Sequence, residues 1–130
     1  MTGIERFASG GQWERGFGYS RAVRAGEMLL VAGTTAIDED GVVRGVGDAG
    51  AQTAFALDRI ATALEEAGAS LEQVVLTRMY VTDITRADEI GRVHGERFGA
   101  HPPVAAMVQV AALIDPRMLV EIEAMAYVGS

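Results

Sequence analysis

The clearest pattern of hydrophobic and polar positions lies in the last quarter of the chain. Side chains alternate along residues 104–113, and the alternation resumes along residues 118–127 after the segment Ile114-Asp115-Pro116-Arg117. A period of two residues is typical of a β-strand, and proline favours a turn between two such runs. The pattern therefore predicts two strands joined by a tight turn.

Two carboxylates interrupt the otherwise apolar second strand. One face of residues 118–127 is wholly apolar, whereas the other face carries Glu121 and Glu123. A carboxylate on a strand fit for burial is costly unless it is paired, hydrogen-bonded, solvated in a cleft or protonated. This makes the glutamates the best candidates for a functional site.

Residues 48–67 have the pattern of an amphipathic helix. Asp48 is a suitable N-cap and Gly68 a suitable residue to end the helix. The apolar stripe follows three- and four-residue spacing and consists of Ala56, Leu57, Ile60, Ala61, Leu64 and Ala67.

A second helix is predicted over residues 86–98, with Thr85 as its cap. Gly91, Gly95 and Gly99 follow one another at every fourth position. Glycine inside a helix costs about 1 kcal/mol relative to alanine. We therefore expect a close approach of another segment along this row.

Short strands are predicted at residues 19–24, 28–34, 42–43 and 74–82. The glycine-rich segment 1–17 is expected to be a loop that Trp13 fixes to the body of the protein. Strands interleaved with two helices indicate an α+β domain with helices on one face of a sheet.

Composition restricts the class of protein further. The chain has 130 residues, 49% of them hydrophobic, and a net charge of −7. The acidic balance argues against nucleic acid as a partner, and the lack of cysteine excludes disulfides and thiolate sites. Two separate histidines do not make a metal site, and we expect no cofactor. We expect a cytoplasmic protein, since no signal sequence or membrane span is evident.

Three segments resemble the RidA family of reactive intermediate deaminases. HPPVAAMVQVAALIDPRMLVEIEAMA is similar to the family's C-terminal signature, and GYSRAVRAGEMLLVAGTTAIDEDGVV to its opening hairpin. DAGAQTAFALDRIATALEEAGASLEQVVLTRMYVTDI is similar to its first helix and the following strand. The resemblance implies one RidA-like (chorismate-mutase-like) domain over residues 1–130, with a six-stranded mixed sheet covered on one face by two helices. It also implies a homotrimer with a barrel-like core and clefts between subunits.

The resemblance assigns roles to two side chains. Glu121 takes the place of the glutamate that positions the water attacking an imine, and a carboxylate in an apolar cleft suits a general base. The alternative is a glutamate satisfied by backbone N–H groups or by arginine. Tyr19 takes the place of the pocket tyrosine, whose hydroxyl donates to substrate or water; alternatively its ring only packs.

Several positions depart from the family pattern. The arginine that grips the carboxylate of 2-iminopropanoate is replaced by Ala105, and losing such a bidentate contact is not conservative. The other departures are Ala32 beside Gly33, Met107, Gly91 and His94. We therefore predict an arginine-lacking branch whose main activity is not 2-iminopropanoate deamination.

Two more charged or titratable residues are candidates. His94 lies on an apolar helix stripe, which favours a core histidine over a proton shuttle working with Glu121. Arg78 lies in the middle of an apolar strand. Pairing with Glu121 or Glu123 is favoured over a role as the missing cation, because buried charges generally have partners.

Together these observations predict a homotrimer that binds a small, mostly apolar imine, enamine or related carbonyl compound in inter-subunit clefts. Glu121 would act as base in hydrolysis or proton transfer, Tyr19 as donor and His94 as a possible shuttle. The candidate substrate-binding residues are Arg78, Ala105, Met107, Ala32, Gly33, Gly91 and Trp13. The alternatives are a non-catalytic ligand-binding trimer and a chaperone-like trimer. No nucleic acid or membrane partner is expected.

Overall fold

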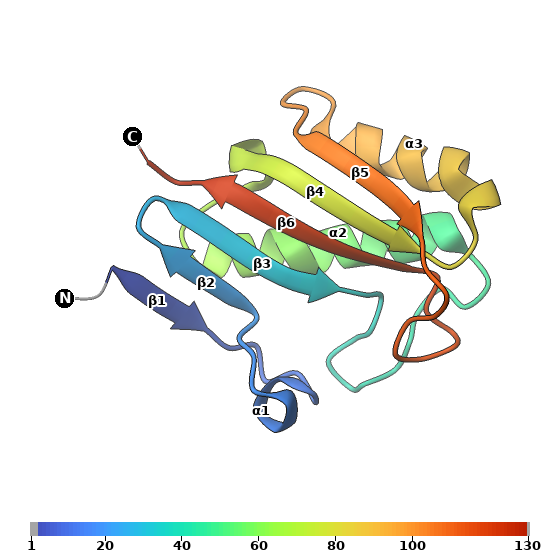
Figure 1. Cartoon of the computed structure of the whole chain (residues 1–130), viewed down its shortest axis with the longest axis horizontal. Coiled ribbons are helices and arrows are strands. Elements are labelled where there is room, and N and C mark those ends of the chain that lie inside the picture. The colour runs from blue at the N-terminus through green and yellow to red at the C-terminus, as the bar shows by residue number, and fades with distance from the viewer. Residues whose placement is uncertain (1–2, 130) are drawn as a thin grey trace.

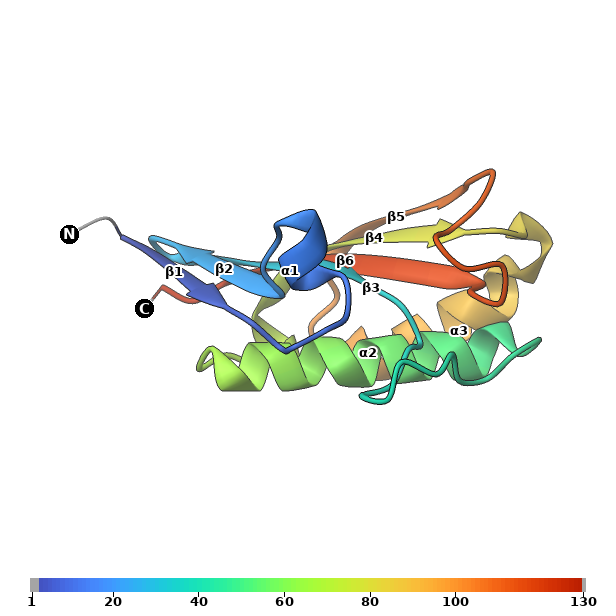
Figure 2. The same ribbon diagram turned by 90° about the horizontal axis from the view of Figure 1, so that it is seen from below.

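The computed structural model describes residues 3–129, which form a six-stranded mixed sheet with two long helices on one face (Figures 1 and 2). The strand order is β1-β2-β3-β6-β4-β5. The strands are β1 Ile4–Phe7, β2 Ala22–Ala25, β3 Met28–Thr34, β4 Val74–Val81, β5 Val104–Gln109 and β6 Val120–Tyr127. The helices are α1 Glu14–Phe17, α2 Ala49–Glu66 and α3 Ala87–Phe98, with 3₁₀ turns at Leu71–Gln73 and Ile84–Arg86. The expected sheet covered on one face by two helices is confirmed.

The core lies between the sheet and the two helices. On β6, every second side chain is buried beneath α2 and α3, as the alternation predicts, and Glu121 and Glu123 lie on the opposite face. The helix α2 contributes Leu57, Ile60 and Leu64, all fully buried. Burial of such side chains contributes roughly 1.5–3 kcal/mol each.

The ends of α2 also follow the sequence. The carboxylate of Asp48 accepts a hydrogen bond from the Ala51 N–H at 2.9 Å, and Gly68 has a φ of +84° directly after the C-cap. A left-handed glycine at this place satisfies carbonyl groups that the last turn would leave free.

The predicted C-terminal hairpin is wrong. The strands β5 and β6 do not pair, since β4 lies between them, antiparallel to β6 and parallel to β5. Because α3 connects β4 to β5, the three form a crossover unit, which joins parallel neighbours. A period of two residues shows which side chains share a face, but it does not identify the neighbouring strand.

The N-terminal segment is not a loop throughout. Ile4–Phe7 forms the edge strand β1, paired with β2, and Glu14–Phe17 forms one helical turn. The expected strand at residues 42–43 is only an isolated bridge between Ile37 and Val43. The sheet has six strands as expected, but the sixth comes from the N-terminal segment.

The cap expected for α3 is wrong. Asp83 rather than Thr85 caps the preceding 3₁₀ turn, because its carboxylate accepts from the Thr85 N–H at 3.0 Å. Of the glycine row, a Cβ on Gly99 would lie 2.7 Å from the Gly95 carbonyl oxygen, whereas a Cβ on Gly91 or on Gly95 would meet nothing of residues 3–129 within 4 Å.

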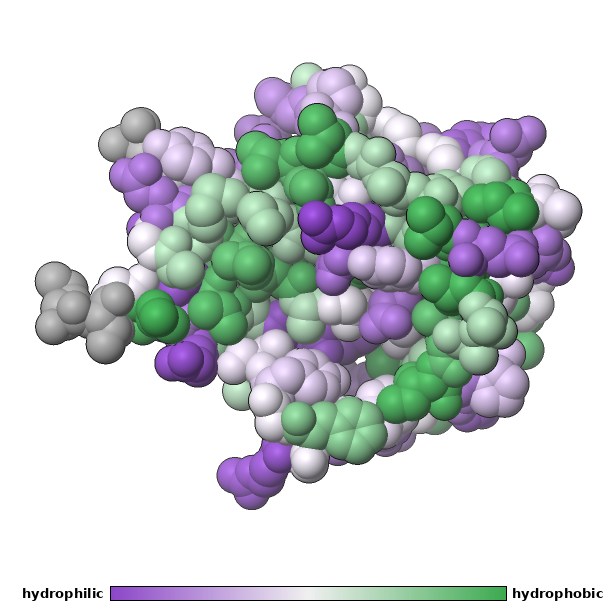
Figure 3. Space-filling view, in the orientation of Figure 1, coloured by the Kyte–Doolittle hydropathy of each residue, from purple (hydrophilic) through white to green (hydrophobic). Residues whose placement is uncertain are grey.

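The sheet face opposite the helices carries many apolar side chains, and no helix within residues 3–129 covers its β6-β4-β5 part. Figure 3 shows these side chains in green, in patches over β3, β6 and β5. Leu30, Val104 and Val108 are 40%, 68% and 48% exposed. We call this surface the open face.

Candidate functional site

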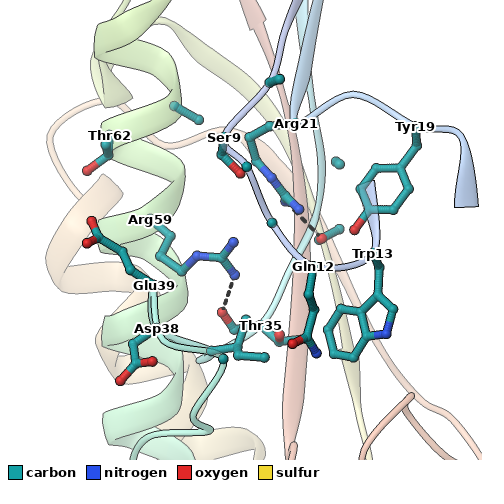
Figure 4. Close-up of a pocket in the computed structure, with 18 of the residues that line it drawn as sticks. Ser9, Gln12, Trp13, Tyr19, Arg21, Thr35, Asp38, Glu39, Arg59 and Thr62 are labelled. Carbon is teal, nitrogen blue, oxygen red and sulfur yellow. Dashed lines mark hydrogen bonds between the residues drawn. The ribbon is translucent and has the colours of Figure 1, made fainter. Parts of the chain in front are cut away.

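A large pocket lies between α2, the end of the sheet and the N-terminal segment (Figure 4). It has a volume of about 1320 Å³, and its walls come from residues 8–21, the segment that follows β3, and one side of α2. The sequence suggested a mostly apolar lining, but the lining is partly charged. It includes Arg21, Arg59 and Glu121 together with the rings of Trp13 and Tyr19.

Glu121 is half-buried at the edge of this pocket, at the place where β6 faces the bulged end of β3. A Cβ built on Gly33 would lie 2.5 Å from Glu121 Oε2, so only glycine leaves room for the carboxylate in this position. Among residues 3–129 the carboxylate has neither a hydrogen bond nor an ion pair. Burial raises the pKa of Glu121, the charge of Glu123 raises it further, and Arg21 opposes both.

The neighbouring Glu123, unlike Glu121, has a hydrogen-bond partner and an ion-pair partner within residues 3–129. It accepts from the Tyr80 hydroxyl at 2.5 Å and pairs with Arg78 at 3.3 Å. This confirms pairing as the role of Arg78, although the guanidinium is half exposed rather than buried. A strand with two glutamates on one face therefore has one paired and one unpaired.

Two aromatic rings form the wall opposite α2. Trp13 precedes the short helix α1 and is half-buried, and Tyr19 follows it, with its ring 5.8 Å from Cζ of Arg21. Both rings face the pocket in Figure 4. The segment around Trp13, which was predicted to be a loop, thus forms one side of the pocket.

A buried ion pair that the sequence did not predict holds this wall in place. Glu14 accepts hydrogen bonds from both Ser9 donors and from the Gly11 N–H, and its carboxylate lies 3.6 Å from Arg21 Nε. Burial raises the pKa of Glu14, but the bonds from Ser9 and the charge of Arg21 outweigh it, so the pKa is lowered. Arg21 also donates to the Gly33 carbonyl at 3.2 Å and to Thr34 Oγ1 at 3.0 Å.

Arg59 is the second cation of the pocket that sequence reasoning missed. It projects from α2 into the pocket and donates to the Thr35 carbonyl at 2.8 Å (Figure 4). Burial lowers the pKa of this guanidinium, and the nearby charge of Arg21 lowers it further. The only signal in the sequence was an arginine directly beside the buried stripe position Ile60.

The structure brings together about half of the residues predicted from sequence. Those that line the pocket are Glu121, Tyr19, Trp13, Ala32 and Gly33. The strand register places the others elsewhere: Ala105 and Met107 stand beside Thr77 and Met79, on the helix-covered face. Gly91 lies on α3, over the same face. Within one chain these positions do not meet Glu121.

His94 also lies on the helix-covered side of the sheet. Its Nε2 is 2.8 Å from Thr77 Oγ1, and its ring stacks on Phe98 at 4.6 Å between centroids. Burial lowers the pKa of the imidazole. These contacts are those of a core histidine, and within the chain His94 does not reach Glu121.

Within residues 3–129, no three His, Asp or Glu side chains gather as a metal site would require. No helix in the described part of the chain combines the length and the apolar character needed to cross a membrane.

Comparison with known proteins agrees with this architecture. A sequence model of the family described as endoribonuclease L-PSP matches residues 15–128. An uncharacterised protein of Streptomyces coelicolor is 39% identical over 127 residues, covering 98% of this chain and 94% of that protein. A RutC family protein of Pyrococcus abyssi is 37% identical over 109 residues, covering 84% and 85%.

Among solved structures, this chain is similar to a Mycobacterium tuberculosis member of the YjgF/YER057c/UK114 family. The two superpose with a TM-score of 0.86 and 52% sequence identity, over 96% of this chain and 99% of the other. The match to the family model, over residues 15–128, includes Tyr19 and both glutamates of β6. The chain therefore belongs to the L-PSP endoribonuclease family, which is the RidA or YjgF family.

Proposed function

We propose that this protein hydrolyses a small imine, enamine or related carbonyl compound in the pocket, with Glu121 as general base. The observation that carries the proposal is the state of Glu121: half-buried, unpaired within residues 3–129, and facing a pocket. A carboxylate held in this way keeps a raised pKa, which suits proton transfer near neutral pH.

Hydrolysis of an imine moves both protons of one water molecule to the nitrogen. Glu121 takes the first proton as the water oxygen bonds to the imine carbon, and its carboxyl group returns that proton to the nitrogen, which gives a carbinolamine. The carboxylate then carries the proton of the carbinolamine hydroxyl to the nitrogen in the same way. The C–N bond breaks as the C=O bond forms, and ammonia and a carbonyl compound are released. We assign to Tyr19 the hydrogen bond to the substrate or the water, and its position in the pocket lining beside Arg21 supports this role.

We further propose that three copies assemble through their open faces into a homotrimer. The exposed apolar residues of β3 and β5 support this, since apolar patches on a surface often mark an interaction site. Assembly of this kind would bring the edge strand β5 of one subunit near a neighbour. The branch lacks the family arginine at Ala105, so we do not expect 2-iminopropanoate to be the main substrate.

The test is an assay of ammonia release from a panel of imines, with and without a carboxylate group. We expect Glu121→Gln to reduce kcat/KM by about 100-fold or more, since general base catalysis typically contributes 10²–10⁴-fold. Glu65→Gln, at an exposed position of α2, is the matched control and should behave like the wild type. Equal rates for the wild type and Glu121→Gln on every imine would refute the catalytic role.

A further inference from the structure

The half-buried guanidinium of Arg59 has no acidic partner among the described residues. Its one hydrogen bond within residues 3–129 goes to the neutral carbonyl of Thr35. Burying a charge is costly unless it is paired. An anionic ligand that enters the pocket would pair with Arg59 and offset this cost. Without such a ligand, the half-buried guanidinium lowers the stability of the folded protein.

Three acidic side chains near Arg59 or on the pocket lining are paired with other residues. Glu14 is held by Ser9, Gly11 and Arg21. Asp38 pairs with Arg44 at 3.1 Å, and Asp58 pairs with Arg97. Glu39, Asp40 and Glu66 also line the pocket, but none of them forms an ion pair with Arg59 within residues 3–129.

Arg21 is the second cation of the pocket lining. It is 6% exposed, lines the same pocket, and its Nε is buried without a hydrogen bond within residues 3–129. The contact with Glu14 at 3.6 Å is an ion pair but too long for a hydrogen bond. The site thus offers one guanidinium without an acidic partner within residues 3–129, that of Arg59. A second guanidinium, that of Arg21, lines the same pocket and is paired with Glu14.

The opposite wall is aromatic. Trp13, Phe17 and Tyr19 line the pocket, and Phe17 remains 66% exposed in the chain. In Figure 4, Arg59 points across the pocket towards the rings of Trp13 and Tyr19. A ligand that satisfies both walls has an anionic group at one end and a bulky apolar or aromatic body at the other.

We infer that Arg59 binds the carboxylate of an aryl or bulky alkyl organic acid whose body packs on Trp13, Phe17 and Tyr19. The inference rests on the proposed function, because it places this acid in the pocket that Glu121 serves. Arg59 is then the specificity-determining residue of the site, and the cation comes from α2 rather than from β5. Guanidinium and carboxylate groups match in a bidentate geometry.

Calorimetric titration of the whole protein tests this without any catalytic step. The probes are 3-phenylpropanoate, the neutral isostere 3-phenylpropanamide, and acetate, which lacks the aromatic body. We expect the aromatic acid to bind about ten- to a hundredfold more tightly than the amide, as a charge-assisted hydrogen bond implies. Acetate should bind more weakly than 3-phenylpropanoate.

Variants assign the preference to Arg59. Arg59→Gln should bind acid and amide equally, and Arg59→Lys should keep part of the preference. Arg92→Gln, which removes an exposed arginine of α3 outside the pocket, should keep all of it. The inference is overturned if the wild type binds acid and amide equally, if it binds neither, or if folded Arg59→Gln keeps the preference. The first two outcomes need no variant to fold.

Glu121→Gln separates this inference from the proposed function. It should retain the preference for the acid while losing hydrolysis. If Glu121→Gln hydrolyses imines as the wild type does, the proposed function fails and the role of Arg59 stands. If Glu121 is essential and the acid preference is absent, only the inference fails.

Discussion

Gly33 controls the position of the proposed base, which makes it the most direct test of the site. A Cβ at residue 33 would lie 2.5 Å from Oε2 of Glu121, 3.0 Å from Cδ and 3.3 Å from Cγ. Ordinary van der Waals contact begins at 3.4 Å, so the carboxylate must withdraw by about 0.9 Å in Gly33→Ala. The glutamate side chain is flexible and can move by rotating about its own bonds.

The effect should therefore fall on activity rather than on stability. Gly33 does not have a positive φ, so alanine is compatible with its backbone. The gain from a stiffer unfolded chain, about 0.4–1 kcal/mol, offsets part of the strain. A displacement of about 1 Å can reduce a rate by roughly 100-fold. We expect kcat/KM to fall by about 10- to 100-fold, with the free energy of unfolding changed by less than about 1 kcal/mol.

Imine hydrolysis and thermal unfolding of the same preparations measure both quantities. Gly95→Ala is the control, because a Cβ there meets nothing within 4 Å and the position is remote from the pocket. It should stabilise α3 by up to about 1 kcal/mol and leave the rate unchanged. A crystal structure of Gly33→Ala with a displaced Glu121 and wild-type kcat/KM would show that the carboxylate is not the base.

Three further outcomes are expected. Because burial and the charge of Glu123 raise the pKa of Glu121, kcat/KM should decline as pH falls through that raised pKa, and Glu123→Gln should shift the decline to lower pH; an unmoved pH profile would contradict the coupling of the two carboxylates. The same raised pKa means that folding favours the protonated form of Glu121. The stability that this carboxyl group contributes is therefore complete below its unfolded-state pKa and is lost as pH rises through its folded-state pKa. Glu121→Gln should thus raise Tm at pH 8 and lose this advantage towards pH 4, as calorimetric melts at both pH values would show. Glu14→Gln leaves Arg21 buried without its counter-charge and should lower the free energy of unfolding in urea by about 3–5 kcal/mol. Arg78→Gln, which breaks a half-exposed pair, should lower it by less than about 1 kcal/mol. Similar losses in the two variants would mean that the Glu14 pair is not a buried one.

The sequence predicted those parts of the fold that depend on local pattern. The alternation on β6 separated buried from open-face residues correctly, and Asp48 and Gly68 marked the ends of α2. The partner of β5 could not be found in this way, because β4 and β6 both present apolar faces of the same period. Likewise, Ile4–Phe7 becomes a strand only because β2 offers a free edge.

The candidate site was predicted in part for a related reason. Glu121 was conspicuous because a carboxylate on an apolar strand breaks the pattern. Glu14 and Arg21 broke no pattern, since both lie in or next to a glycine-rich segment where polar residues are ordinary. Their burial follows from the packing of that segment against β3, with Arg21 bonded to Gly33 and Thr34.

These two arginines change what the alanine expected at the family's arginine position means for the ligand. The resemblance implied a cleft that had lost its cation and become more apolar. The pocket instead holds Arg59 on the side of α2, opposite two aromatic rings, and Arg21 beside the ring of Tyr19. A positive charge in a different place selects acids of a different shape, since the distance and direction from Glu121 to the cation set where the reacting carbon lies. An arginine introduced by Ala105→Arg would then add a second cation on the helix-covered side of the sheet rather than complete the existing site.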